Sequence, residues 1–359
     1  MRIETMRTVA VINAMKSRRP TGIGIAGDGV AQLLPAGAAM TSPRLDRLFS
    51  AVNNKPLPGP GRALLRLLLV QCAPFFFPRN ARLIFTSHNA PLWRTGRHAI
   101  ILHDTIPLQF PEQAPAQSRY FRRALPRALR CAERIVVISA ATRDDFVARG
   151  FAAVQAATVI PSFSAALGRE AANRAVARSR NELLVVGPRY AHKNIDVVLA
   201  ALVKLNEAPP APWRLTLAGA DRLLWAKPWG GLEFFERRGW VRTIAHVDEA
   251  ELAALYAGAT ALVYPSLAEG QGLPPLEAMA AGCPAICSDL PVLRETCGDA
   301  AVYFPATDAA ALARLIAGVA AGADEAAAAG LAAAARERLA GFSREALGAR
   351  WREFLEAWQ

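Results

Sequence analysis

Two glutamates that flank a glycine-rich turn carry the clearest chemistry in this sequence. Glu269 and Glu277 are separated by seven residues, and a helix is expected to begin between them near Pro274 or Pro275, because proline is well tolerated at a helix start. A helix start offers backbone N–H groups to a phosphate, and carboxylates accept hydrogen bonds from sugar hydroxyls. The turn itself consists of Gly270, Gln271, Gly272 and Leu273. The segment therefore predicts a site that holds phosphate and sugar groups.

Two cations and a histidine follow apolar segments that are expected to be strands. Arg189 and Lys193 come after Glu182–Val186, ahead of a helix whose N-terminus also favours anions. Two cations at this place predict a clamp for a diphosphate. His103 directly follows Ala99–Leu102, so it is expected at a strand end that faces a binding cleft. A buried histidine beside an ordinary turn is the alternative for His103.

The string Gly22-Ile-Gly24-Ile-Ala-Gly27 matches the dinucleotide-binding pattern only in part. That pattern requires the glycines to follow a strand directly and to open a helix, whereas residues 14–21 lie between Gly22 and the expected strand. We prefer a flexible loop whose backbone approaches a diphosphate closely. Gly22 and Gly24 are therefore candidates for one wall of the site.

Apolar strands that alternate with helix-length segments must position these residues. Such strands are typical of parallel sheets that helices cover on both faces. We expect strands at Thr8–Asn13, Ala81–Thr86, Ala99–Leu102, Arg134–Ile138, Thr158–Ile160, Glu182–Val186, Arg214–Leu217, Thr243–Ala245, Ala261–Tyr264, Ala285–Cys287 and Ala301–Phe304. We expect helices at Arg119–Ala132, Thr142–Arg149, Asn194–Leu205, Glu249–Ala257, Pro275–Ala281 and Ser343–Trp358. A polar, alanine-rich stretch at residues 164–180 separates the two series, which predicts two doubly wound α/β domains.

Composition agrees with two domains and points to an anionic partner. The 359 residues, 53% of them hydrophobic, exclude a disordered chain and a fibre. The net charge of +12 is uneven, because residues 1–166 hold 22 Lys and Arg against eight Asp and Glu, whereas residues 167–359 hold 20 against 22. A basic first half predicts a nucleic acid, an acidic membrane or a phosphorylated substrate as partner. On one expected helix an anion-facing surface would comprise Arg119, Arg122, Arg123, Arg127 and Arg130.

The sequence predicts a cytoplasmic protein. Its five cysteines are odd in number and dispersed, which argues against a disulfide framework. The first 20 residues lack the apolar core of a secretory signal, and Leu64–Phe77 is too short and too broken to cross a bilayer. Peripheral attachment to the inner face of the plasma membrane remains compatible with these features.

The chain resembles the retaining glycosyltransferases of family 4, which have the two-domain GT-B architecture. The resemblance covers essentially the whole chain, and its most specific part is EGQGLPPLEAMAAGCP, with LYAGATALVYPS before it and SDLPVLRETCGDAAVYF after it. Further matching blocks are VGPRYAHKN, SHNAPLWRTGRHAIILHDTIPLQFPE, RALPRALRCAERIVVISAATRDDF and PTGIG. The most similar subgroup builds bacterial surface polysaccharides, often as mannosyl- or rhamnosyltransferases.

The resemblance implies two Rossmann-like domains that face each other across a deep cleft. Residues 1–166 would form the acceptor-side domain and residues 167–342 the nucleotide-sugar domain. The last helix, at residues 343–359, would pack back towards the first domain.

The resemblance also implies a role for each candidate residue. Glu277 would hold the ribose and Glu269 would contact the donor sugar, while Arg189 and Lys193 would hold the diphosphate. His103 would lie near the donor sugar. Backbone contacts and the opposite wall would come from Gly270, Gln271, Gly272, Leu273, Gly22 and Gly24. Gln271 stands where the family usually has an aromatic residue, which leaves the donor preference open.

The implied reaction moves a hexosyl unit, with mannose as the first expectation, from a nucleoside-diphosphate sugar to a glycan or a polyprenyl-diphosphate-linked acceptor. It would serve the synthesis of O-antigen, exopolysaccharide or capsule. The sugar–phosphate bond breaks through an oxocarbenium-like state, and nearby cations stabilise the leaving diphosphate. No Asp-x-Asp motif occurs, so we expect a reaction without a metal or another cofactor. The basic first half would dock on an anionic membrane.

Three alternatives compete with this interpretation. A sugar-nucleotide epimerase of the same architecture should lack the pairing of Glu269 with Glu277. A catalytically silent nucleotide-sugar-binding subunit of a polysaccharide assembly complex would not need both the glutamates and the cations. A nucleic-acid-binding protein is disfavoured because no recognised binding motif or aromatic platform accompanies the charge.

Overall fold

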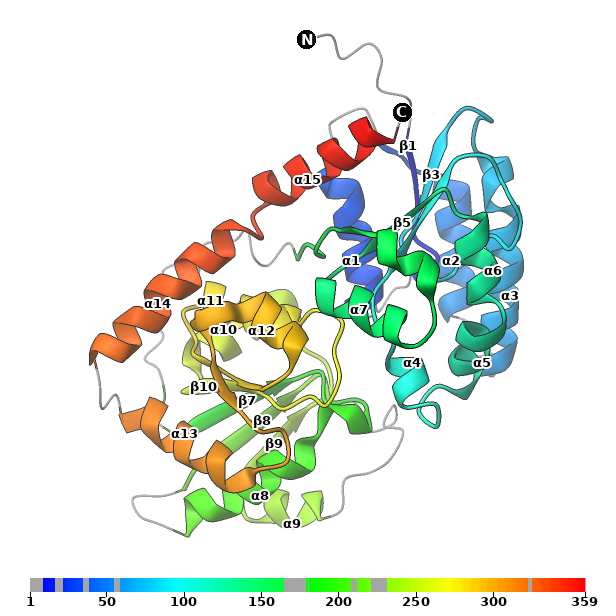
Figure 1. Cartoon of the computed structure of the whole chain (residues 1–359). Helices are drawn as coiled ribbons and strands as arrows, with labels where there is room; N and C mark the ends of the chain where they lie inside the picture. The colour runs from blue at the N-terminus through cyan, green and yellow to red at the C-terminus, as the bar shows by residue number, and fades with distance from the viewer. Residues whose placement is uncertain are drawn as a thin grey trace. The chain divides into compact units, whose positions relative to one another are not determined.

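The computed structural model describes residues 9–16, 22–34, 39–54, 59–164, 179, 181–207, 212–220, 231–321 and 325–358. The chain divides into two compact units: unit 1 is Met1–Ser164 with Phe342–Gln359, and unit 2 is Ala165–Gly341. Each unit contains a parallel six-stranded sheet (Figure 1). The boundary predicted between residues 166 and 167 lies outside the described residues. Among the described residues, no helix combines the length and the apolar character that crossing a bilayer requires.

The sheet of unit 1 has the strand order β2-β1-β3-β4-β5-β6. Its strands are β1 (Val9–Ile12), β2 (Ala39–Met40), β3 (Arg82–Phe85), β4 (His98–Leu102), β5 (Arg134–Val137) and β6 (Thr158–Val159). The sequence predicted all of them except β2, which has only two residues and no apolar run of its own. The order of addition reverses between β1 and β3, so these two strands flank the switch point of the sheet.

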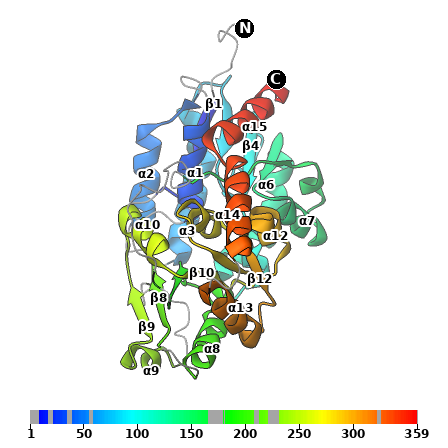
Figure 2. The same ribbon diagram turned by 90° about the vertical axis from the view of Figure 1, so that its left-hand side faces the viewer.

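Helices cover both faces of this sheet. They are α1 (Gly22–Leu33), α2 (Pro43–Asn54), α3 (Gly59–Cys72), α4 (Ile106–Gln109), α5 (Pro115–Arg123), α6 (Leu125–Cys131), α7 (Ala140–Ala148) and α15 (Arg344–Ala357), with short 3-10 helices η2 (Ala73–Phe76) and η3 (Ala152–Ala156). On one face, α1 and α15 lie side by side (Figure 2). On the other face Ala10, Ile12, Leu83 and Phe85 form a buried core with residues of α2, α3, α5 and α6.

The single helix expected over Arg119–Ala132 is wrong. Helix α5 ends at Arg123 and α6 begins at Leu125. Pro126, the second residue of α6, has no N–H that could bond to the carbonyl of Arg122, so the helix cannot continue unbroken. The five arginines of this stretch are exposed, but they are divided between two helices.

The sheet of unit 2 has the strand order β12-β11-β10-β7-β8-β9. Its strands are β7 (Glu182–Val186), β8 (Arg214–Ala218), β9 (Val241–Ile244), β10 (Ala261–Tyr264), β11 (Ala285–Ser288) and β12 (Val302–Phe304). All six were expected from the sequence, within one or two residues. Strands β7 and β10 are neighbours although they are distant in sequence, and they flank the switch point of this sheet.

Helices of unit 2 also lie on both faces of its sheet (Figure 1). One face carries α8 (Ile195–Asn206), α9 (Leu232–Arg237) and α13 (Ala309–Ala321), and the other carries α10 (Glu249–Gly258), α11 (Leu273–Ala280) and α12 (Pro291–Cys297). Helix α14 (Glu325–Ala340) packs against α11. The core on the α8 side contains Leu183, Val198 and Leu202, all of which are completely buried.

Candidate functional site

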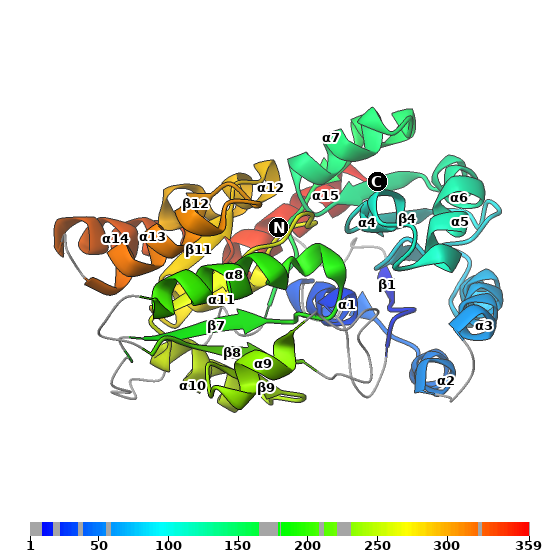
Figure 3. The ribbon, with the colours of Figure 1, turned by 90° about the horizontal axis from the view of Figure 1, so that it is seen from below.

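Strands β7 and β10 pair in parallel at the switch point of unit 2, so the loops that follow them lie together. Figure 3 shows β7 next to β8 in this sheet. In parallel α/β sheets, ligands bind beyond the carboxyl ends of the strands, where neighbouring loops diverge at the switch point. The loop after β7 carries Arg189 and Lys193, and the loop after β10 carries Glu269. The topology therefore collects these sequence candidates at one edge of the sheet.

Lys193 and Glu269 form an ion pair across this edge. The Lys193 Nζ lies 2.5 Å from Oε1 of Glu269, and their side chains are only 17% and 9% exposed. The Lys193 ammonium also lies 5.2 Å from the centre of the Tyr264 ring and 3.4 Å from its hydroxyl. The ammonium thus has a carboxylate and an aromatic ring as neighbours, and both attract a positive charge.

The ionisation of this cluster follows from burial and from the ion pair. Burial by itself would raise the pKa of Glu269, but the attraction of Lys193 outweighs it, so the net pKa is lowered and the carboxylate stays charged. Burial, together with repulsion from Glu269, raises the pKa of Tyr264 well above its ordinary value. Burial, followed by repulsion from Lys193, lowers the pKa of His192 to about 4. At neutral pH the site is therefore a charged pair between a neutral tyrosine and a neutral histidine.

Further bonds hold the two loops in register. The Asn194 side chain donates to the carbonyl of Pro265 at 3.0 Å and to that of Ala306 at 2.7 Å. The N–H of Leu267 donates to the carbonyl of His192 at 2.7 Å. Asn194 has φ +53°, a left-handed conformation that asparagine adopts more readily than most residues, and it caps the start of α8. The position of Lys193 relative to Glu269 is therefore fixed by the backbone.

The glycine-rich turn leads into α11 through Gly272. Gly272 has φ +101°, and a Cβ atom there would lie 2.7 Å from Cδ2 of Leu293. The carbonyl of Gln271, which is buried, accepts a hydrogen bond from Oγ1 of Thr296 at 2.8 Å. Only glycine fits this turn without strain.

Helix α11 begins at Leu273, one or two residues earlier than expected. Pro274 and Pro275, the second and third residues of the helix, have no N–H to offer to an anion. Donors for an anion must therefore come from the turn itself, from Gly270 to Leu273.

Glu277 is the fifth residue of α11 and thus lies just beyond its first turn. Its Oε2 accepts a hydrogen bond from the hydroxyl of Tyr256, at 3.1 Å. Tyr256 is buried in α10, and burial raises its pKa well above the ordinary value, with Glu277 adding to the effect. Tyr256 therefore remains a hydrogen-bond donor and fixes the orientation of the carboxylate.

Arg189 is placed differently from Lys193. It follows β7 in the same loop and is half-buried, yet within the described part of the chain its guanidinium has no hydrogen-bond or ion-pair partner. The structure thus pairs one of the two predicted cations with Glu269 and leaves the other available for an external anion.

In unit 1, His103 lies at the carboxyl end of β4 and is buried. Its Nε2 lies 2.8 Å from the carbonyl oxygen of Thr86. A carbonyl only accepts, so Nε2 carries the proton and Nδ1 is left as an acceptor. Burial lowers the pKa of His103, which keeps the ring neutral.

The flexible loop expected at Gly22 and Gly24 is wrong, because both residues belong to the first turn of α1. The side chain of Asn13 donates to the carbonyl of Gly24 at 2.9 Å, which ties the helix to the end of β1. A Cβ atom on Gly27 would lie 2.6 Å from Oγ1 of Thr86. The glycine pattern thus allows a helix to pack closely on strand ends. Residues 17–21, which precede this helix, lie outside the described residues.

Three side chains that were not predicted from the sequence lie beside the predicted residues. Tyr264 and His192 adjoin the Lys193–Glu269 pair, and Tyr256 adjoins Glu277. Each lies in a motif block next to a predicted residue, and Tyr264 ends a strand. Aromatic residues in apolar strands and helices ordinarily belong to the core, so their type gave no signal.

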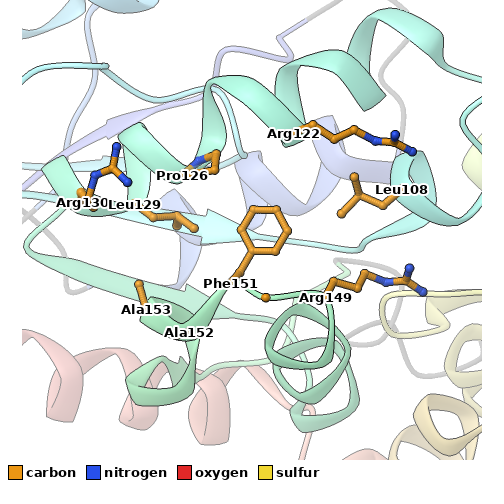
Figure 4. A pocket seen from close by; sticks show the side chains of 10 residues that line it. Leu108, Arg122, Pro126, Leu129, Arg130, Arg149, Phe151, Ala152 and Ala153 are labelled. Carbon is orange, nitrogen blue, oxygen red and sulfur yellow. The ribbon is translucent and has the colours of Figure 1, made fainter.

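A hollow of about 680 Å³ lies elsewhere in unit 1, between the α5–α6 pair and the segment after α7. Phe151 projects into its middle, Arg122 and Arg149 reach towards one end, and Arg130 lies at the other (Figure 4). None of the predicted site residues lines this hollow. The candidate site is therefore defined by the strand ends.

Comparison with known proteins gives a family match in unit 2. Residues 180–321 match the family model described as Glycosyl transferases group 1. The O-antigen chain mannosyltransferase B of Escherichia coli is 30% identical over 232 residues. That alignment covers 61% of this chain and 60% of the relative, so it spans about three fifths of the relative's length.

Solved structures give a fold match over nearly the whole chain. Sucrose-phosphate synthase from Thermosynechococcus elongatus has a TM-score of 0.70 at 18% identity, covering 98% of both chains. HepE of Anabaena, in complex with UDP and glucose, has a TM-score of 0.69 at 16% identity, covering 98% of this chain and 100% of that one. At these identities the likeness concerns the fold.

Proposed function

Because residues 180–321 form a glycosyl transferases group 1 domain in a chain with the two-sheet GT-B fold, we propose that the protein is a retaining glycosyltransferase. The observation that carries the proposal is the Lys193–Glu269 pair at the switch point of this domain. A cation and a carboxylate at such an edge suit a ligand that has a diphosphate next to a sugar.

The proposed donor is a nucleoside-diphosphate sugar. Glu277, oriented by Tyr256, accepts hydrogen bonds from the ribose, and Glu269 contacts the donor sugar. Arg189 and Lys193 hold the diphosphate, with backbone N–H groups of the glycine-rich turn as further donors. His103 of unit 1 has an acceptor Nδ1 that suits a hydrogen bond from a sugar hydroxyl.

The proposed chemistry breaks the bond between C1 of the sugar and the diphosphate oxygen through an oxocarbenium-like state. The acceptor hydroxyl attacks C1 from the face that the diphosphate leaves, and its proton passes to an oxygen of that diphosphate. The two cations stabilise the negative charge that develops on the leaving group. This route needs no resident metal, and unchanged turnover in EDTA would support that part of the proposal.

We further propose that the transferred unit is mannose and that the acceptor is a glycan or a polyprenyl-diphosphate-linked glycan of O-antigen, exopolysaccharide or capsule. The support is the name of the Escherichia coli relative, an O-antigen chain mannosyltransferase. The reaction would take place at the cytoplasmic face of the plasma membrane.

A thermal-shift panel with GDP-, UDP- and dTDP-sugars tests the proposed donor, since a ligand that binds only the folded form raises the melting temperature. We expect one sugar nucleotide to give the largest shift and to be hydrolysed slowly without acceptor. NMR of the anomeric proton of a transfer product would show the retained configuration. Tight binding without any turnover would instead indicate a silent nucleotide-sugar-binding subunit.

Arg189 offers a test of the mechanism that is separate from folding. Arg189→Ala should lower kcat by about 10²–10³-fold, the usual effect of removing one group that stabilises charge in the transition state. Arg189→Lys should recover part of the loss. An inverted product, or a kcat unchanged in Arg189→Ala, would contradict the mechanism.

A further inference from the structure

A segment of unit 1 contains no acidic residue over an unusual length. Between Asp46 and Asp104 the sequence has no Asp or Glu, whereas it has seven arginines and one lysine. The segment comprises most of α2, α3, η2, β3 and β4. Every charged side chain that this segment itself contributes between these two aspartates is therefore positive.

The same segment exposes large apolar side chains. Among the described residues nine such side chains are exposed, and five of them lie between residues 64 and 93. These five, which we term the apolar strip, are Leu64 (60% exposed), Leu68 (54%), Phe75 (77%), Phe76 (40%) and Trp93 (37%). Isolated exposed apolar residues are common, but a group of this size within one segment is typical of an interaction site.

The strip is continuous in structure as well as in sequence. Leu64 and Leu68 are four residues apart on α3 and so share one face of the helix. Helix α3 leads directly into η2, which carries Phe75 and Phe76. Phe75 stacks on Trp93, with ring centres 5.8 Å apart and planes at 27°.

The exposed aromatic residues are held in place by buried anchors. Val70 and Phe77, on either side of η2, are part of the core. The N–H of Leu92 donates to Oε1 of Gln71 at 2.9 Å, and its carbonyl accepts from Nε of Arg127 at 2.6 Å. The loop with Trp93 is thus bonded to both α3 and α6, and exposure of Phe75 and Trp93 does not result from a loose chain end.

Positive charge surrounds the strip. Arg79 and Arg94, both exposed, directly follow Phe75–Pro78 and Trp93. Arg127 contacts the Trp93 loop and is exposed as well. Aromatic side chains that project from a basic surface suit the interface of an anionic bilayer, where rings lie at the level of the headgroups and arginines meet the phosphates.

We infer that the apolar strip and its arginines form a docking surface for an anionic lipid bilayer. A second copy of this chain is a poor occupant, because a symmetric contact would bring the same acid-free surfaces together. The inference rests on the proposed function in one respect: a lipid-linked acceptor would be presented to the enzyme at such a membrane. The docking surface itself consists of residues other than the predicted site residues.

Co-sedimentation of the full-length protein with vesicles tests the inference without any sugar nucleotide. We expect binding to vesicles of phosphatidylcholine with phosphatidylglycerol, much weaker binding to phosphatidylcholine alone, and a loss of binding as the salt concentration rises. Phe75→Ser with Trp93→Ser should weaken binding by at least about tenfold, since two large apolar groups no longer enter the bilayer.

Phe234→Ser is the matched control, because Phe234 is an aromatic residue of unit 2 with 42% exposure, outside the strip. It should bind vesicles like the unmodified protein. Equal binding of the double variant, or equal binding to neutral vesicles at low salt, would overturn the inference. Sedimentation velocity without vesicles gives a further test. If the unmodified protein forms a dimer and the double variant does not, the strip binds a second copy of the chain and the inference is overturned.

Lys193→Gln separates this inference from the proposed function. It should weaken binding of the sugar nucleotide and leave vesicle binding intact. If the protein binds the sugar nucleotide but no vesicles, the docking surface is refuted and the proposed transferase function stands. If it binds vesicles but no sugar nucleotide, only the transferase function is refuted.

Discussion

Lys193 and Glu269 are 76 positions apart in sequence, and the pairing of β7 with β10 brings their charged atoms to 2.5 Å. Both lie in loops that follow neighbouring strands, at the point where the strand order of the sheet reverses. In the absence of ligand each neutralises the other. A diphosphate that binds as proposed would have to compete with Glu269 for Lys193, and the proposed donor sugar could then bind to the released carboxylate.

The stability of this pair should depend on pH. The pKa of Glu269 is lowered below its ordinary value of 4.5, so the stabilising contribution is present above pH 4.5 and is lost as the pH falls through the lowered pKa. The difference in unfolding free energy between the unmodified protein and Glu269→Gln should therefore shrink on acidification. Urea titrations between pH 3 and pH 7 measure it. A difference that grows towards low pH would show that the pair is not formed.

Removing both members of the pair should cost less than the sum of the two single losses. Lys193→Met leaves a buried carboxylate without its partner, which costs on the order of 3 kcal/mol. In Lys193→Met with Glu269→Gln the second change removes the uncompensated charge, so the loss should be smaller than the sum of the single losses. A double-mutant cycle by urea unfolding gives the coupling. Additive losses would mean that the two residues do not interact.

Glu277 and Tyr256 should contribute unequally to nucleotide binding. Glu277→Ala would remove the proposed hydrogen bonds to the ribose and should weaken binding about ten- to hundredfold. Tyr256→Phe removes only the bond that orients the carboxylate, so its effect should be smaller and in the same direction. Isothermal titration with the preferred nucleotide measures both. Unchanged affinity in Glu277→Ala would refute the ribose assignment.

Gly272 should not tolerate a side chain. Gly272→Ala forces a Cβ into a left-handed conformation and against Leu293, and should cost on the order of 1–3 kcal/mol. Gly318→Ala is the matched control, because Gly318 lies in α13 with open space around it, and alanine favours a helix there by up to about 1 kcal/mol. Opposite shifts in melting temperature are expected. Two equal shifts would contradict the strained turn.

Buried histidines should make the protein sensitive to mild acid. Burial lowers the pKa of His88 to about 3, and that of His98 and His192 to about 4. Below pH 6.5 these histidines bind protons in the unfolded chain but stay neutral in the folded chain. The free energy of unfolding should therefore fall from pH 6.5 towards pH 4. His98→Phe should reduce this slope by up to about one proton. Urea midpoints measured at each pH test it, and a stability that is flat over this range would contradict the burial.

The sequence predicted the sheets well and the site in part. Long apolar strands such as Glu182–Val186 are defined by their own residues, because a strand buried on both faces needs an unbroken apolar run. The expected GT-B fold is confirmed by the two parallel sheets and by the structural neighbours. Lys193 and Glu269 were both predicted to follow strands, which is consistent with their being close. Their contact also depends on the pairing of β7 with β10.

Other features depended on contacts that a linear reading does not contain. Gly22 and Gly24 begin a helix, and Asn13, which stands before this helix in the sequence, donates to the carbonyl of Gly24. Tyr256 became a site candidate only through its distance to Glu277. The break between α5 and α6 at Ala124 could have been predicted from Pro126. A proline has no N–H, so the backbone hydrogen bond that would continue α5 into α6 is missing.

Unit 2 is inserted within unit 1, because Phe342–Gln359 returns to the first unit. Trp351 of α15 and Trp358, which directly follows the helix, are buried there, and Arg82 of β3 donates to the carbonyl of Leu355 at 3.0 Å. During synthesis, unit 2 is complete before the ribosome has made the helix that unit 1 needs. Unit 1 therefore cannot complete its core before unit 2 has been synthesised, and unit 2 is the unit that can fold first during translation.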